Sequence, residues 1–163
     1  KKNNLINQSK QFDDISNEIK NNFTYCWYYF FEFIFIFTNR WKKQVGDLEI
    51  FSVGMVIMWH SLVTKSYQAN GWNFSKWKKI KIKVPETGVN TMSISEITNI
   101  PRPTVVRKLN YLLKNKYISV NKKKLFNVNM QDKTLTDTIK LQEKNVVSLA
   151  YLVFKIFNQI NIK

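Results

Sequence analysis

Two of the three arginines of this lysine-rich chain, Arg102 and Arg107, lie five residues apart in one short segment. The planar guanidinium of arginine can contact O6 and N7 of guanine together, which lysine does less selectively. Between them, Thr104 can bind a phosphate through its hydroxyl or backbone N–H, and Val106 can meet a thymine methyl. These residue types suit contacts with a nucleic acid. The alternative is that the arginines form structural ion pairs or lie there by chance.

The basic charge of the chain is concentrated around the same segment. The sequence holds 26 lysines and arginines against 11 acidic residues, a net charge of +15. Residues 65–124 carry 14 basic and 2 acidic residues, whereas residues 1–64 carry 7 and 6, and residues 125–163 carry 5 and 3. A genomic bias toward lysine would spread the charge evenly, so this block predicts a polyanionic partner held by Coulomb attraction and counterion release. A solvated lysine surface is the alternative.

Two short helices joined by a tight turn are expected to position these side chains. In the first helix, Ile94 and Ile97 form an apolar side, and Thr91 or Asn90 can cap the N-terminus. Asn99 tolerates the left-handed backbone that a tight turn needs. The pattern therefore predicts a helix that ends in a turn at about residue 99.

The second helix is expected to begin near Thr104, with Arg102 at its exposed N-terminal end. Pro101 and Pro103 restrict the approach to this helix, where a missing N–H group costs nothing. Its apolar residues follow helical spacing and form an inward stripe: Val105, Leu109, Leu112 and Leu113. Its other faces carry Val106, Arg107, Asn110 and Lys114. Such a helix buries one side and offers a cationic side outward.

A basic hairpin follows this helix. Residues 117–120 and 125–128 are two short β-prone runs around Asn121 and three consecutive lysines, Lys122, Lys123 and Lys124. This arrangement predicts a hairpin with a lysine tip. A basic loop beside a recognition helix can reach the adjacent DNA backbone or minor groove.

The segment 91–130 resembles a helix-turn-helix of the winged, bacterial-regulator kind. Pairs of residues match the family pattern: Ile94-Ser95 for Leu–Ala, Asn99-Ile100 for Gly–apolar, Thr104-Val105 for Thr–apolar, then Arg107-Lys108-Leu109 and Leu112. Ser93 replaces the acidic residue of the family, and Ser95 replaces its small apolar contact. Asn115-Lys116 takes the place of the helix-ending glycine, and asparagine can adopt that left-handed cap. The order of helices, helix-turn-helix, hairpin and helix resembles MarR-type regulators, which implies a mainly α fold.

The resemblance implies sequence-specific binding of double-stranded DNA by a transcriptional regulator. Arg102 and Arg107 would contact bases or flanking phosphates, and Lys108 and the lysine tip would mostly contact phosphates. The expected DNA-binding residues are Thr91, Ser93, Arg102, Pro103, Thr104, Val106, Arg107, Lys108, Lys122, Lys123 and Lys124.

The N-terminal half divides into three parts by composition. Residues 1–22 form a polar arm with a helix from about Asp13. Residues 23–65 hold two apolar helices, the first over 23–38 and the second from about Asp47 to Val63. The first is apolar nearly all round and too short to span a bilayer, so a core or a subunit interface should bury it, although a buried strand stays open. Residues 66–90 form a basic connector with an alternating strand over 79–84, flanked by Trp72 and Trp77, which either anchor it or offer stacking surfaces.

The second apolar helix is expected to be deeply buried. Its apolar residues follow helical spacing, and three more widen the face: Ile50, Phe51, Met55, Met58, Trp59 and Leu62, with Val53, Val56 and Ile57. The C-terminal part, residues 131–163, contains a long amphipathic helix whose stripe also needs cover: Ile139, Val146, Leu149, Val153, Ile156, Phe157 and Ile160. Together with the first apolar helix it suggests a homodimer, while packing within one monomer stays open.

Several function classes are excluded or disfavoured by residue counts. One cysteine, Cys26, one histidine, His60, and four glycines exclude a disulfide scaffold, multi-histidine metal sites and glycine-rich phosphate loops. We expect no catalytic residue, no metal and no cofactor, since pairing His60 with Glu49 gives no recognisable constellation. His60 is either a packed core histidine or a sensor of an unknown effector.

The location expected for a regulator of this kind is cytoplasmic, without stable membrane insertion. No secretory signal pattern is seen, because the apolar run starts too late and lacks a cleavage site. The chief rival function is a membrane-surface or scaffold protein, in which the aromatic run and the basic connector engage anionic lipid. RNA binding through the hairpin and tryptophans is a further alternative.

Overall fold

The computed structural model describes residues 2–63, 75, 86–129 and 133–160. The chain divides into two compact units. The first consists of Lys1–Asn39 and Glu143–Lys163, and the second of Arg40–Gln142. The predicted strand over 79–84, with Trp72 and Trp77, lies outside the described residues.

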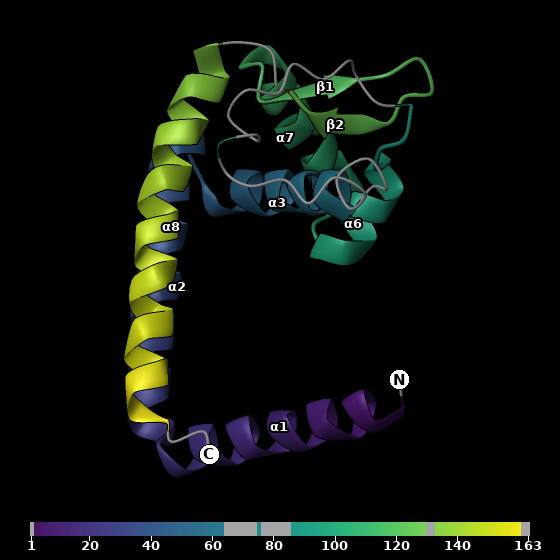
Figure 1. Ribbon diagram of the computed structural model, residues 1–163. Helices are drawn as coiled ribbons and strands as arrows, with labels where there is room; N and C mark the ends of the chain where they lie inside the picture. The colour runs from purple at the N-terminus through teal and green to yellow at the C-terminus, as the bar shows by residue number, and fades with distance from the viewer. Residues whose placement is uncertain (1, 64–74, 76–85, 130–132, 161–163) are drawn as a thin grey trace. The chain divides into compact units, whose positions relative to one another are not determined.

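The second unit packs three helices on a small antiparallel sheet (Figure 1). Helix α3 (Leu48–Val63) contacts α6 (Thr91–Thr98), α7 (Arg102–Lys114) and strand β2 (Phe126–Val128). Strand β1 (Ile118–Val120) pairs with β2 so that Ile118 faces Val128 and Val120 faces Phe126. Val89, just before α6, forms a single bridge to Phe126. The prediction of a mainly α fold with a small hairpin is confirmed.

The core of this unit is made by one apolar side of each helix. Its most buried side chains are Val53 and Ile57 of α3, Ile94 of α6, and Val105, Leu109 and Leu112 of α7. Burial of this apolar surface is the main term that stabilises the unit. The predicted burial of α3 is confirmed for Val53, Val56 and Ile57 but wrong for Trp59, which is 61% exposed.

The first unit is built on two long helices that run antiparallel. Helix α2 (Phe23–Val45) and α8 (Lys133–Gln159) meet at Tyr29 and Tyr151, whose ring centroids lie 5.9 Å apart. At the end of this pair where α2 begins and α8 ends, the side-chain amide of Gln159 donates to Asn22 Oδ1 at 3.1 Å. The strand alternative for residues 23–38 is therefore wrong.

Helix α1 (Lys2–Asn21) begins well before the expected Asp13.

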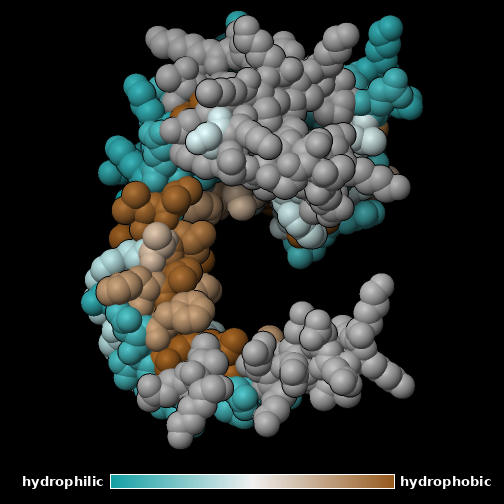
Figure 2. All heavy atoms as spheres, in the orientation of Figure 1, coloured by the Kyte–Doolittle hydropathy of each residue, from teal (hydrophilic) through white to brown (hydrophobic). Residues whose placement is uncertain are grey.

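The predicted burial of α2 and α8 is only partly found. On α2, Cys26 is buried but Phe35 is 69% exposed. Much of the predicted α8 stripe is also exposed, at Val146, Leu149, Val153 and Phe157. Figure 2 shows hydrophobic residues gathered on the surface over α2 and α8. Within the described residues, no helix combines the length and the apolar character that crossing a bilayer requires.

Candidate nucleic-acid interface

Helix α7 has one buried and one exposed side. Val105, Leu109 and Leu112 are buried against the rest of the second unit. The exposed side carries the two arginines and their neighbours: Arg102, Pro103, Val106, Arg107, Asn110, Tyr111 and Lys114. The prediction that Arg102 and Arg107 face outward is confirmed. These two exposed guanidinium groups, one at the first residue of α7 and one in its second turn, form the centre of the candidate interface.

The first turn of α7 offers free backbone donors. The helix begins at Arg102, two residues before the expected Thr104, and Pro101 holds the N-cap position with Pro103 in the first turn. The N–H of Val105 is the first to bond back, to the carbonyl of Pro101 at 3.0 Å. The N–H groups of Arg102 and Thr104 precede this bond and lie at the positive end of the helix dipole. An anion would be stabilised at this end.

Side chains close the turn between α6 and α7. Asn90 is the N-cap of α6, since its Oδ1 accepts from the N–H of Ser93 at 2.9 Å. Asn99 has the predicted left-handed backbone, with φ of 54°. The hydroxyl of Ser95 donates to the carbonyl of Ile100 at 2.7 Å. Ser95, a departure from the family pattern, therefore ties the end of α6 to the start of α7.

Thr91 and Ser93 are less available than the sequence predicted. Both are half-buried, and the backbone N–H of Ser93 is occupied by the Asn90 cap. Their hydroxyls are the groups left for a ligand. The predicted contacts at Pro103 and Val106 fall on exposed positions, and Thr104 is half-buried.

The end of α7 differs from the prediction. Lys116, with φ of 60°, takes the left-handed position, while Asn115 keeps a φ of −87°. The N–H of Lys116 bonds to Leu113 O and the N–H of Tyr117 to Leu112 O, which is the bond pattern of a Schellman cap. The cap turns the chain into β1, and so brings the hairpin next to α7.

The lysine tip of the hairpin is exposed and built on one asparagine. Asn121 Oδ1 accepts from the N–H groups of Lys123 and Leu125, both at 3.0 Å. Lys124 has φ of 58°, and all three lysines of the tip are exposed. Lys123 lies 3.7 Å from Glu86, an exposed pair of little energetic weight. The tip therefore keeps its cationic groups accessible.

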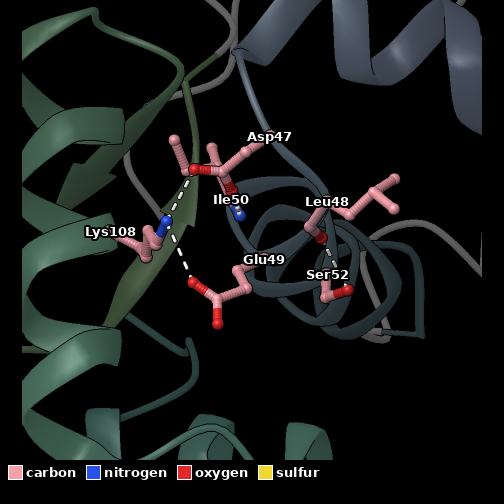
Figure 3. A network of polar contacts seen from close by, with 6 residues as sticks. All are labelled: Asp47, Leu48, Glu49, Ile50, Ser52 and Lys108. Atoms are coloured by element: carbon pink, nitrogen blue, oxygen red, sulfur yellow. Dashed lines mark hydrogen bonds and ion pairs between the residues drawn. The ribbon is translucent and has the colours of Figure 1, made fainter.

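Lys108 does not belong to this surface, which corrects its predicted phosphate contact. The residue is only 9% exposed, on the buried side of α7. Its Nζ lies 2.6 Å from Asp47 Oδ2 and 3.0 Å from Glu49 Oε2, both at the start of α3 (Figure 3). A lysine held by two carboxylates is not available to a DNA backbone.

The ionisation of this cluster follows from the two ion pairs. Burial raises the pKa of the Asp47 carboxyl, but the hydrogen bonds from Lys108 and from the N–H of Ile50 outweigh it, so the net pKa is lowered. The hydrogen bond to Asp47 raises the pKa of Lys108 more than burial lowers it, and Glu49 adds to the rise. Both partners are therefore charged at neutral pH.

Sequence reasoning missed this cluster although two signals were present. Lys108 falls between Val105 and Leu109, at the spacing of the inward stripe, where a lone lysine needs a partner. The second signal is the pair of carboxylates at the start of the second apolar helix, Asp47 and Glu49, of which only Glu49 was considered, as a partner of His60. Asp47 is the cap of this helix, accepting from the N–H of Ile50 at 2.7 Å.

The enzyme alternative is not supported by the placement of its two residues. Glu49 and His60 are 11 residues apart on α3, roughly 16 Å along a helix, and Glu49 binds Lys108. His60 is half-buried, and its Nδ1 is buried without a hydrogen-bond partner among the described residues. Among the residues that the structure describes, no three histidine, cysteine or acidic side chains gather where they could hold a metal ion.

Comparisons with known proteins do not assign the chain to a family. No family model matches the chain, and neither the curated proteins nor the solved structures give a significant match.

Proposed function

We propose that the chain binds duplex DNA as a winged helix-turn-helix protein of MarR-like architecture and regulates transcription. In this proposal α7 is the recognition helix and the β1–β2 turn is the wing. The observation that carries it is the exposure of Arg102 and Arg107 on the outer face of α7, whose inner face is packed against α3. The exposed lysine tip, on the strand pair that follows α7, supplies further cationic groups.

The element order supports the same proposal. A buried helix precedes two short helices joined by a tight turn, and a basic hairpin and a long helix follow. Arg102 and Arg107 contact base edges in the major groove, with Val106 against a thymine methyl. Thr104 binds a phosphate at the helix N-terminus, and Lys122, Lys123 and Lys124 bind phosphates beyond the groove.

A homodimer completes the proposal. The exposed apolar side chains on α2 and α8 of the first unit need cover, and a second copy of the chain supplies a matching surface. Twofold symmetry then presents two recognition helices to successive major grooves, about 10 base pairs apart or a multiple of it. The proposed location of such a regulator is the cytoplasm.

The test is selection of bound sequences from a pool of random duplexes, followed by binding of the selected duplex at several salt concentrations. We expect the selected sequence to be palindromic. For each phosphate neutralised, log K should fall by about 0.9 per tenfold rise in salt concentration. Weak binding to every duplex with no dependence on salt would overturn the proposal. A single-stranded RNA of the same sequence as competitor separates RNA binding from duplex DNA binding.

Two variants of Arg107 sharpen this experiment. Arg107→Ala removes a base contact, so its affinity for the selected duplex should fall by about 1–3 kcal/mol with relaxed preference at one position. Arg107→Lys is the matched control, because it keeps the charge but loses the planar fork. It should keep the salt dependence and lose the preference. Equal loss on all duplexes would assign Arg107 to the backbone.

One observation favours a second function. Aromatic side chains on α2, including Trp27, Tyr28 and Phe31, are exposed, and such side chains also suit the interface of a membrane. Co-sedimentation with vesicles of anionic phospholipid, compared with a mobility shift on duplex DNA, separates the two. Tight binding to vesicles without DNA binding would favour a membrane-surface role.

A further inference from the structure

Lys108 occupies a position on α7 where an apolar residue would serve packing equally well. It lies on the buried side of the helix, between Val105 and Leu109, and faces α3. Burying an ammonium group carries a desolvation penalty that its ion pairs only offset. Replacing such buried pairs with apolar residues is often neutral or stabilising. Stability alone therefore does not account for a lysine here.

The carboxylates that hold Lys108 are themselves fixed. Asp47 caps α3 through the N–H of Ile50, and Glu49 lies in the first turn of the same helix. Both reach the Nζ of Lys108, at 2.6 and 3.0 Å (Figure 3). The ammonium group is thus held by two oxygens from one helix end. Such a contact is directional, whereas the apolar contacts of Val105, Leu109 and Leu112 are not.

The direction of Lys108 determines the direction of the exposed arginine next to it. Successive residues of an α-helix are about 100° apart around the axis. A rotation of α7 that moved Lys108 away from α3 would therefore turn Arg107 by the same angle. The close-packed apolar residues of the inner face resist such a rotation as well, and the two ion pairs of Lys108 add a directional restraint to that packing.

Residues 44–49, which lead into α3, also hold the C-terminal end of α7. The hydroxyl of Tyr117, just after α7, donates to the carbonyl of Gln44 at 3.0 Å and accepts from the Gln44 side chain at 3.3 Å. A Cβ placed on Gly46 would lie 3.6 Å from the hydroxyl of Tyr111 on α7. Residues 44–49 thus contact α7 or its end at Lys108 and Tyr117.

We propose that Lys108 is a positioning residue for DNA recognition. Its ion pairs with Asp47 and Glu49 fix the rotation of α7 about its axis, and this rotation determines which base edges Arg102 and Arg107 meet. Lys108 itself contacts no DNA. The inference rests on the proposed function, because it concerns the sequence preference of the same helix.

The experiment compares Lys108→Met with Lys114→Met in the full chain. Lys114 is an exposed lysine of the same helix, so both variants lose one charge from α7. For each, affinity is measured on the selected duplex and on a scrambled duplex of equal composition, over a range of salt. Lys108→Met should reduce the ratio of the two affinities by about tenfold, the scale of one base contact, and leave the salt dependence unchanged. Lys114→Met should leave the ratio unchanged.

A second variant approaches the same pair from α3. Asp47→Asn with Glu49→Gln removes both negative charges while the asparagine keeps the helix cap. It substitutes no residue of α7, and it should reduce the affinity ratio as Lys108→Met does. This variant decides the matter if Lys108→Met does not fold, since both carboxylates are partly exposed. An apolar packing role for Lys108 would not produce this result.

The outcomes separate the inference from the function. If the wild-type chain selects no duplex, the proposed function is wrong. If it selects one and both variants keep its affinity ratio, the positioning role is wrong. If Lys108→Met instead lowers affinity equally on both duplexes with a smaller salt dependence, Lys108 contacts phosphate and the inference is likewise overturned.

Discussion

The two units of this chain treat apolar residues in opposite ways. In the second unit, Val53, Ile94 and Val105 are completely buried by neighbouring helices. In the first unit, Phe35 of α2 and Phe154 of α8 are 69% and 59% exposed, although both lie within long helices. The two units differ in how completely neighbouring elements cover their apolar side chains. Helix α3 is apolar on most sides and is covered by α6, α7 and β2, whereas the described neighbours of α2 and α8 leave many of their apolar side chains exposed.

This comparison indicates where each unit obtains its stability. The second unit has a closed core, and its polar contacts, such as the Lys108 cluster, act on the arrangement of that core. In the described part of the first unit, aromatic rings contact one another along and between the helices, as Tyr25 does with Tyr29 and Tyr29 with Tyr151. The second unit should therefore be the more sensitive to the loss of one apolar side chain.

Truncation of one core residue should have the largest effect. Leu109→Ala removes a side chain that is fully enclosed in the second unit, and such changes destabilise by about 2–5 kcal/mol. Phe154→Ala is the comparison in the first unit and should change the free energy of unfolding by less than about 1 kcal/mol at low protein concentration. Urea unfolding followed by circular dichroism measures both.

Protein concentration sharpens this result. If a second copy covers α8, Phe154→Ala should weaken association in sedimentation experiments while Leu109→Ala changes it little. An equally large destabilisation by Phe154→Ala at the lowest concentration would mean that the side chain is buried within one chain, and the comparison between the units would fail.

Two glycines of the second unit should respond with opposite signs. A Cβ on Gly88 would lie 2.8 Å from the carbonyl oxygen of Phe126 and 2.9 Å from Cβ of Leu125, so Gly88→Ala should destabilise by about 1–3 kcal/mol. Gly54 lies within α3 with no atom within 4 Å of such a Cβ. Gly54→Ala should stabilise by about 0.5–1 kcal/mol, because alanine is the better helix former.

Thermal unfolding of the two alanine variants under identical conditions checks this pair. A neutral Gly88→Ala would show that the strand pair can move away from residue 88, and that the approach of residues 88–89 to β2 is loose. Destabilisation by Gly54→Ala would show that this part of α3 is covered by something beyond the described residues.

The elements of the second unit were predictable because local signals agreed with the packing. The Asn90 cap, the left-handed Asn99 and the inward stripe of α7 all follow from residue type and spacing. The left-handed Lys116 was missed because lysine has no special preference for that backbone, and the Schellman bonds impose it. The early start of α1 was missed because its first residues carry no apolar period.

The candidate site was predictable in its exposed part and not in its buried part. Exposure of Arg102, Arg107 and the lysine tip follows from helical and hairpin geometry alone. The position of Lys108 depends on a carboxylate 61 residues away in the chain, which no local pattern reveals. The same limit applies to the first unit, where periodicity identified the helices but not which sides are covered.

Lowering the pH should reveal how much the Lys108 cluster contributes to folding stability. This should be the smallest of the predicted effects. The pKa of Asp47 is below its ordinary value of 3.8, so its folded state favours the charged form. Its contribution to stability is therefore complete above about pH 3.8 and is lost as pH falls through the lower folded value. Because the carboxylate is partly exposed, the loss should be less than about 1 kcal/mol. Asp47→Asn keeps the cap and cannot titrate, so the stability difference between wild type and this variant at neutral pH should vanish once the pH lies below the lowered folded pKa of Asp47. A difference that persists in acid would mean that the aspartate stabilises α3 by its shape and not by its charge, and Lys108 would then be held chiefly by Glu49.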